Sequence, residues 1–151
     1  MSLDKVLLAV EPADRDHLET LVEATIDVVD AHDAIVYLLY LFLESEYDDL
    51  LEQTNLEAVS GRRSPDELAA RHKSVRTPVS MLESHDVDYG IRGVVGGNSA
   101  SQVVKRVEEL NANMVIVGGS ERSPTGKAMF GDHAQQVLLS ASCPVLYVKR
   151  E

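Results

Sequence analysis

Short apolar runs alternate with amphipathic stretches along this whole chain, and that alternation restricts the possible folds more than any other feature. The runs, rich in valine, leucine and isoleucine, lie at residues 6–10, 35–42, 88–95, 114–117 and 144–148. Continuous apolar runs are typical of strands that are covered on both faces. Because helical stretches separate the runs, the strands should pair in parallel through right-handed crossovers. The sequence therefore predicts one α/β domain over residues 1–151, with a Rossmann-like, five-stranded, mostly parallel open sheet and helices on both faces.

Apolar stripes and capping residues mark the helices of the first half. The acidic stretch 44–52 predicts a short helix, and Ser64 is followed by Pro65 and Glu67 in the pattern of a helix start. Pro78 should bend or break the helix that continues to about residue 85. His72 lies on the apolar stripe of that helix, and we interpret it as a hydrogen-bonded, half-buried side chain rather than as a ligand. The helix predicted over residues 16–31 has a stripe formed by Leu18, Leu21, Val22, Thr25, Ile26 and Val29.

The second half repeats the pattern. Residues 96–98 predict a turn, and Ser99 is the expected N-cap of a helix that ends near Leu110. The only cysteine, Cys143, cannot form an internal disulfide, and we interpret it as a small buried apolar residue. The last helix, predicted over residues 132–140, is expected to bury Ala134, Val137, Leu138 and Ala141.

Charge and hydropathy limit the partners. The chain has 25 acidic and 14 basic residues and a net charge of −11. Such a surface repels nucleic acids and anionic membranes, so we expect no partner of either kind. No leader pattern and no apolar stretch of spanning length is visible, which predicts a cytoplasmic protein. The acidity fits a salt-loving source and an ordinary acidic protein equally, and both interpretations stay open.

The segment from Gly118 to Gly131 is the candidate functional loop, because it leaves a strand and enters a helix. Glycines free backbone N–H groups to face an anion, and the helix N-terminus adds a partial positive charge. Arg122 and Lys127 are basic residues in an acidic chain. Nucleotide or phosphate binding and an ordinary strand-to-helix connection remain equal alternatives. A P-loop is rejected, since residues 121–128 lack its glycine at Glu121 and its hydroxyl at Ala128.

The order of elements, this glycine loop and the ending Cys143-Pro144-Val145-Leu146-Tyr147-Val148 resemble the universal stress protein family. The family's nucleotide motif is Gly, two residues, Gly, nine residues, Gly, then Ser or Thr. Gly118 and Gly131 match its first and last glycines, whereas Glu121 and Asp132 depart from the other two positions. The resemblance covers nearly the whole chain. It implies an adenine nucleotide alpha hydrolase-like fold and, in part of the family, ATP binding.

The resemblance also implies where a nucleotide would lie, with adenine and ribose near Val10, Glu11 and Leu41. Glu11 would accept a hydrogen bond from ribose or adenine, or else would simply cap the turn after the first strand. A carboxylate at Asp132, about 4 Å from a phosphate, costs roughly 1 kcal/mol in water-like surroundings and about 4 kcal/mol at an effective dielectric of 20. A Mg²⁺ ion or nearby basic and hydroxyl side chains would offset this cost. The expected nucleotide-binding residues are Val10, Glu11, Leu41, Val117, Gly118, Arg122, Ser123, Thr125, Lys127, Gly131, Asp132 and His133, although His133 itself is expected to face solvent.

These observations predict a regulatory stress-response protein that binds an adenine nucleotide, ATP, weakly. No hydrolytic motif is visible, so we expect no enzyme activity, and a slow ATPase is disfavoured. The alternative is the same fold acting as an interaction module without a nucleotide. The resemblance implies a homodimer through residues 145–148, which would otherwise form an unprotected sheet edge.

Overall fold

The computed structural model describes residues 3–53, 64–119 and 132–149. The five predicted strands are all present. The elements in order are β1 (Lys5–Val10), the short 3-10 helix η1 (Pro12–Asp14), α1 (Leu18–Val29), β2 (Ile35–Phe42), α2 (Glu44–Gln53), α4 (Pro65–Arg71), α5 (Lys73–Ser84), β3 (Asp88–Val95), α6 (Ser99–Leu110), β4 (Met114–Gly119), α7 (Asp132–Ser140) and β5 (Val145–Lys149).

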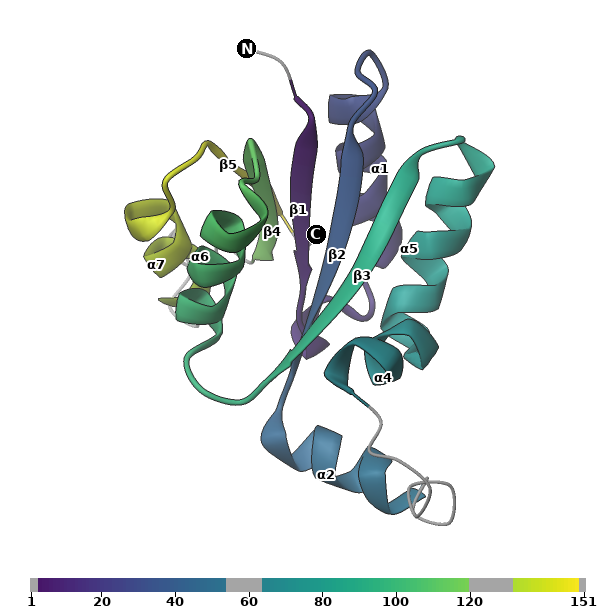
Figure 1. The fold of residues 1–151 in the computed structure, drawn as a ribbon, viewed down its shortest axis with the longest axis vertical. Helices are drawn as coiled ribbons and strands as arrows, with labels where there is room; N and C mark the ends of the chain where they lie inside the picture. Colours follow the sequence, from purple (N-terminus) through teal and green to yellow (C-terminus); the bar gives the residue numbers. More distant parts are fainter. Residues whose placement is uncertain (1–2, 54–63, 120–131, 150–151) are drawn as a thin grey trace.

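The strands form one parallel sheet in the order β3-β2-β1-β4-β5 (Figure 1). The chain builds outward from β1 to β3, then returns across β1 and builds β4 and β5 on the other side. The order of the strands thus reverses between β1 and β4. Open sheets of this kind place their ligand sites at the carboxyl ends of the strands beside such a switch point. The predicted fold class is confirmed.

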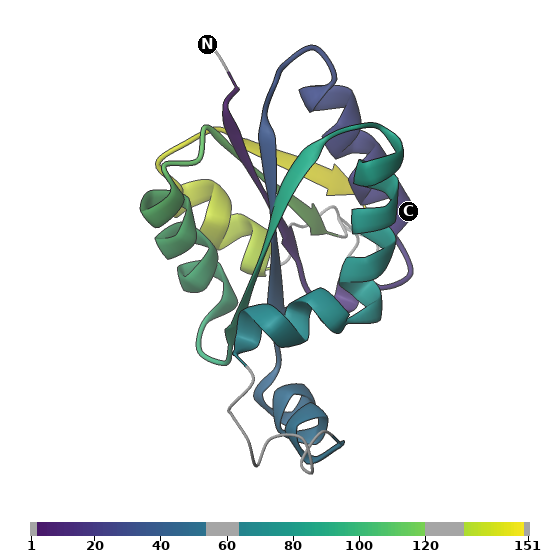
Figure 2. The same cartoon turned by 45° about the vertical axis from the view of Figure 1, so that its right-hand side comes forward.

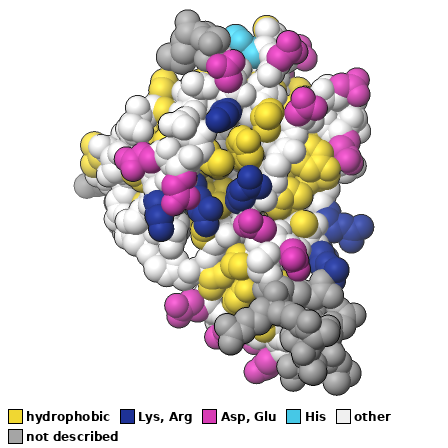
Figure 3. Space-filling model, viewed as in Figure 1, with side chains coloured by type: hydrophobic (Ala, Val, Ile, Leu, Met, Phe, Trp, Pro, Cys, Tyr) yellow, Lys and Arg dark blue, Asp and Glu magenta, His cyan; other side chains and the backbone are white. Residues whose placement is uncertain are grey.

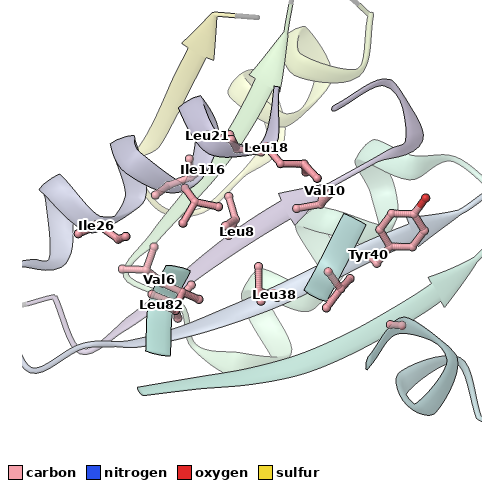
Figure 4. Packing of buried hydrophobic residues seen from close by; sticks show 14 of the residues in the cluster. Val6, Leu8, Val10, Leu18, Leu21, Ile26, Leu38, Tyr40, Leu82 and Ile116 are labelled. Atoms are coloured by element: carbon pink, nitrogen blue, oxygen red, sulfur yellow. The ribbon is translucent and has the colours of Figure 1, made fainter. Parts of the chain in front are cut away.

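Helices cover both faces of the sheet, which explains why the central strands are apolar throughout. Val6, Leu8 and Val10 of β1 face the layer of α1, α4 and α5 (Figures 1, 2 and 4). Leu7 and Ala9, which alternate with them, face the layer of α6 and α7. Val6 to Val10 are buried on both faces of the sheet, so the only polar residue of β1 is Lys5 at its start.

The helix stripes agree with the prediction in α1 and differ from it in α7. All six predicted stripe residues of α1 are buried. In α7, Ala134 and Val137 are buried, but Leu138 is 38% exposed and the expectation for it is wrong. Because α7 packs at the β4–β5 edge of the sheet and against α6, only a narrow stripe of it is covered. Cys143 is partly buried beside this layer, and burial raises the pKa of its thiol, which disfavours the reactive thiolate.

The break in the predicted helix over residues 64–85 lies at His72 and not at Pro78. His72 has an extended backbone, with φ −72° and ψ 139°, and its Nδ1 accepts a hydrogen bond from the Ser74 N–H at 3.0 Å. His72 therefore caps α5, while the Ser64 side chain caps α4 as predicted. Pro78 lies within α5 with its ring buried. The capping bond and the side-chain contacts of His72 stabilise the non-helical backbone there, and sequence spacing does not reveal them.

A second correction concerns α6. Its N-cap is Asn98, whose side chain accepts a hydrogen bond from the Ser101 N–H at 3.0 Å, and Ser99 is the first helical residue. The Ser99 hydroxyl is consequently available for another contact.

The surface agrees with the composition. Figure 3 shows acidic side chains spread over one face, with Lys and Arg gathered across its middle. Within the part of the chain that the structure describes, no helix is long and apolar enough to cross a membrane.

Candidate functional site

A pocket of about 370 Å³ lies at the carboxyl ends of β1, β2 and β3. It borders β1, one of the two strands at the switch point, and none of its lining residues belongs to β4. Its floor and walls are mainly apolar, and its polar side chains come from the end of β1 and the starts of α2 and α6. The residues that line it are Glu11, Pro12, Leu41, Phe42, Leu43, Glu44, Val94, Gly96, Gly97 and Ser99.

The turn between β3 and α6 gives the pocket its shape. Gly96 and Gly97 have φ of +67° and +69°, a conformation that residues with a side chain rarely adopt. A Cβ at Gly96 would also lie 2.6 Å from Oε1 of Glu44, so the turn packs closely on the start of α2. These two glycines bring α6 back over the sheet, and Ser99 reaches the pocket as a result.

Glu11 stands where β1 ends. Its N–H donates to Oδ2 of Asp14 at 2.9 Å, and its C=O accepts from the Asp14 N–H at 2.9 Å, so the backbone here turns into η1. Glu11 and Asp14 form the capping box of this short helix. The Glu11 side chain is only 20% exposed and also lines the pocket. The turn-capping role foreseen for Glu11 is confirmed, and the carboxylate is at the same time placed at the candidate site.

His133, in the first turn of α7, contacts two of the pocket's polar side chains. Its Nδ1 lies 2.8 Å from the Ser99 Oγ, and its Nε2 lies 3.7 Å from Oε2 of Glu11. The side chain is 16% exposed, so the expectation that His133 faces solvent is wrong. It is held between the ends of two elements that are far from it in sequence.

The other predicted site residues fall into three groups. Leu41 lines the pocket. Val10 and Val117 are buried in the two core layers, and Gly118 is buried near the end of β4. Glu121, Arg122, Ser123, Thr125, Lys127 and Gly131 lie outside the described residues, as does the side chain of Asp132, the first residue of α7. Of the three residues predicted near adenine and ribose, Glu11 and Leu41 line the pocket, whereas Val10 lies in the core.

The charge around the described part of the pocket is negative. Glu11 and Glu44 line it, and none of its lining residues is Lys or Arg. Among the described residues, no group of three or more His, Cys, Asp or Glu side chains could hold a metal ion.

A separate cluster anchors α2 to the sheet. The Tyr40 hydroxyl donates to Oε2 of Glu46 at 2.9 Å, and Nε2 of His72 lies 2.8 Å from the same oxygen. The Tyr40 and His72 rings stack at 4.2 Å between centroids. Burial, followed by the hydrogen bond and charge of Glu46, raises the pKa of Tyr40 well above its ordinary value. The structural interpretation of His72 is confirmed.

The structure is thus a doubly wound α/β domain with a pocket at the carboxyl ends of its strands, the edge at which such sheets usually hold small molecules. The model of the universal stress protein family matches residues 2–149. The chain therefore belongs to the universal stress protein family. A universal stress protein of Mycolicibacterium smegmatis is 30% identical over 94 residues, which are 62% of this chain and 72% of that protein.

Solved structures with this fold include two nucleotide complexes. The universal stress protein from Archaeoglobus fulgidus in complex with dAMP has a TM-score of 0.64 and 18% identity, covering 99% of this chain and 100% of that one. A universal stress protein family protein from Arabidopsis thaliana with AMP bound has a TM-score of 0.63 and 16% identity, covering 98% of this chain and 92% of that one. At these identities the similarity shows the fold.

Sequence reasoning did not foresee the contact between Ser99, His133 and Glu11. Ser99 and His133 are 34 residues apart, and no local motif joins them. Only the predicted topology could have indicated this contact. Each of the three residues lies just after a strand or in the first turn of a helix, at the carboxyl edge of the sheet.

Proposed function

We propose that this protein is a stress-response regulator that binds an adenine nucleotide in the pocket at the carboxyl ends of β1, β2 and β3. One observation carries the proposal: a pocket of about 370 Å³ lies at the carboxyl ends of β1, β2 and β3, on the β1 side of the switch point, with apolar walls and a few polar side chains. Its volume is within the range of small-molecule sites, about 300–1,000 Å³. The dAMP and AMP complexes of proteins with the same fold support this class of ligand.

The pocket suits the adenosine part of a nucleotide. Leu41 and Val94 offer apolar surface to a purine ring. The Glu11 carboxylate, acting only as an acceptor, can take a hydrogen bond from a ribose hydroxyl or from the adenine amino group. The same preference for donors explains why Glu11 would favour a nucleoside over an anion at this end.

The phosphates would extend toward the glycine loop after β4. There we propose that Arg122 and Lys127, with the hydroxyls of Ser123 and Thr125, contact them, and that the backbone at Gly118 and Gly131 leaves room for them. Glu121 and Asp132 would oppose the phosphate charge. We therefore propose weak binding that is stronger for AMP than for ATP alone, with Mg²⁺ improving the binding of ATP by bridging Asp132 to the phosphates.

The first experiment is mass spectrometry of the small molecules released when gently purified protein is denatured. We expect an adenine nucleotide. Thermal unfolding with AMP, ATP and ATP–Mg²⁺ then measures affinity, because a ligand that binds only the folded state raises the midpoint. No released nucleotide together with no midpoint shift at millimolar ligand would refute nucleotide binding and would favour the alternative, an interaction module with the same fold.

Two variants locate the site. Val94→Phe adds a ring to the pocket wall and should abolish most of the shift caused by AMP. Val104→Phe adds the same bulk to α6 outside the residues that line this pocket, and should leave the shift unchanged.

Asp132→Ser restores the family's hydroxyl and should raise ATP affinity by about ten-fold or more, through the loss of charge repulsion. Unchanged affinity in Asp132→Ser would contradict the assigned role of Asp132.

A further inference from the structure

Three residues from separate elements converge at the pocket in the arrangement of a nucleophile, a base and a carboxylate. The Oγ of Ser99, at the start of α6, lies 2.8 Å from Nδ1 of His133 on α7. Nε2 of the same ring lies 3.7 Å from Oε2 of Glu11, at the end of β1. We propose that Ser99 is a nucleophile toward small neutral carboxylic esters in this pocket, with His133 as general base and Glu11 as the positioning residue.

The carboxylate sets the tautomer of the imidazole. A carboxylate accepts hydrogen bonds and favours an N–H on the ring nitrogen that faces it. With the proton on Nε2, toward Glu11, Nδ1 is free to accept from the Ser99 hydroxyl. The Ser99–His133 distance is already that of a nucleophile bonded to its base, whereas the Glu11–His133 distance is long, as it often is in a site without substrate.

The start of α6 supplies donors for a developing oxyanion. The Asn98 side chain accepts a hydrogen bond from the Ser101 N–H, and the Asn98 C=O accepts one from the Gln102 N–H at 3.1 Å. Helix geometry leaves the N–H groups of Ser99 and Ala100 without an acceptor inside the helix. They stand beside the nucleophile at the positive end of a 12-residue helix. A tetrahedral intermediate on Ser99 would develop its negative charge next to them.

The reaction balances without any further reagent. The Ser99 oxygen forms a bond to the ester carbonyl carbon while its proton moves to Nδ1 of His133. The bond from that carbon to the alkoxy oxygen breaks, and the alcohol leaves with the proton from His133. Water then attacks the acyl-serine, giving its proton to His133, and the carboxylic acid is released as Ser99 recovers its proton.

The pocket selects the class of ester. Its described lining residues carry two carboxylates, Glu11 and Glu44, and no basic side chain, so an anionic ester is disfavoured. The volume of about 370 Å³ limits the acyl and alcohol parts together to the size of a small molecule. The apolar walls at Leu41 and Val94 suit short aliphatic or aromatic groups.

The test uses a fluorophosphonate probe, which reacts covalently with activated serine hydroxyls, on the full chain. We expect one adduct per chain, located by peptide mass spectrometry at Ser99. Ser99→Ala should remove the adduct, and His133→Ala should slow its formation by about 10²-fold or more. Ser101→Ala, on the same helix turn but pointing to no base, should label like the wild type. Absence of labelling in the wild type, or an adduct elsewhere, would overturn the proposal without any variant.

A second measurement separates a catalytic base from a packing role. The readouts are the rate of labelling and the rate of hydrolysis of p-nitrophenyl acetate, both of which need an imidazole that accepts the serine proton. Glu11→Gln should lower both rates by about ten-fold or more, and Glu11→Asp should restore part of the loss. If both rates are unchanged in Glu11→Gln, the assigned roles are wrong.

This inference uses the same pocket as the proposed nucleotide but does not require one. Labelling is measured without nucleotide, and the AMP midpoint shift is measured in Ser99→Ala as well as in the wild type. Labelling without an AMP shift would refute nucleotide binding alone. An AMP shift without labelling would refute the nucleophile alone. Where both occur, AMP should protect Ser99 from the probe.

Discussion

At the scale of single residues, the protonation of the Tyr40 hydroxyl is linked to the stability of the folded protein. It is the largest fully buried side chain among the described residues, and its hydroxyl donates a hydrogen bond to Glu46. Burial and the Glu46 carboxylate raise its pKa in the folded protein above the unfolded value of about 10. The folded state therefore holds this proton more tightly than the unfolded state does. The resulting stability is complete below about pH 10 and is lost as the pH rises further.

We predict that the free energy of unfolding falls between about pH 9 and about pH 11, and that Tyr40→Phe reduces the size of this fall. Urea unfolding of the wild type and Tyr40→Phe at both pH values measures it. Tyr89→Phe is the comparison: its hydrogen bond to Glu83 also raises the pKa of Tyr89, but this pair lies at the surface, so its removal should reduce the fall less than Tyr40→Phe does. Equal losses in the wild type and Tyr40→Phe would show that Tyr40 does not control the alkaline transition.

Gly93 is required by a close approach of backbone. A Cβ built there would lie 2.3 Å from the carbonyl oxygen of Pro65, so any side chain must push α4 away from β3. We predict that Gly93→Ala lowers the free energy of unfolding by about 1–3 kcal/mol, the usual cost of overpacking. Gly90→Ala is the matched control, because its Cβ would meet only the movable Tyr37 ring at 3.0 Å. The two free energies, measured by urea unfolding, would contradict this account if they were equal.

Some residues of the candidate site were predicted from the sequence, and the contacts of others were missed because they depend on tertiary packing. Glu11 was foreseen as the residue at the end of an apolar strand, whereas Leu41, which lies within β2, was expected at the site only because of the family resemblance. His133 was placed in solvent, because a lone histidine in a first helical turn carries no sign of its partners. The contacts with Ser99 and Glu11 arise from the packing of α7 on α6, which local sequence does not encode.

At the scale of elements, the capping of α6 is the clearest test of the structure against the sequence. Asn98 accepts from the Ser101 N–H, whereas Ser99 lies inside the helix. We predict that Asn98→Ala costs about 1 kcal/mol of folding free energy through the lost cap. Ser101→Ala should cost less, because the cap uses the backbone N–H of Ser101 and not its exposed side chain. Chemical unfolding measures both losses, and equal losses would contradict the assignment of Asn98 as the cap.

The boundaries of helices and strands were predicted correctly where they depend on adjacent residues. They were missed where they depend on contacts between distant parts of the chain. The strand over residues 35–42 and the start of α4 at Ser64 agree, since hydrophobic runs and capping patterns belong to adjacent residues. The break at His72 depends on Glu46 and Tyr40, which lie on α2 and β2. The exposure of Leu138 depends on how little of the sheet α7 covers.

At the scale of the whole molecule, β5 forms one edge of the sheet (Figure 1). Val145, Leu146, Tyr147 and Val148 are only partly buried in the single chain. We propose that this edge pairs with a second copy, which would protect its backbone groups and cover these side chains.

We predict that light scattering after size-exclusion chromatography gives the mass of a dimer, and that Leu146→Lys shifts the protein toward monomer by placing a charge at the covered edge. Leu139→Lys is the control, because Leu139 on α7 is 79% exposed and lies outside β5. A monomeric wild type, or a dimer that Leu146→Lys leaves intact, would contradict pairing through β5.

The central position of β1 also has a consequence for synthesis. β1 pairs with β2 on one side, but its other neighbour, β4, begins only at Met114. While the ribosome adds the intervening residues, β2, β3 and the α1, α4 and α5 layer are already available, and one edge of β1, which is apolar from Val6 to Val10, stays open. The unpaired backbone groups of such an edge can form hydrogen bonds with other nascent chains. The chain should therefore complete its sheet only near the end of translation, and chaperone contact is expected to concentrate on β1 until then.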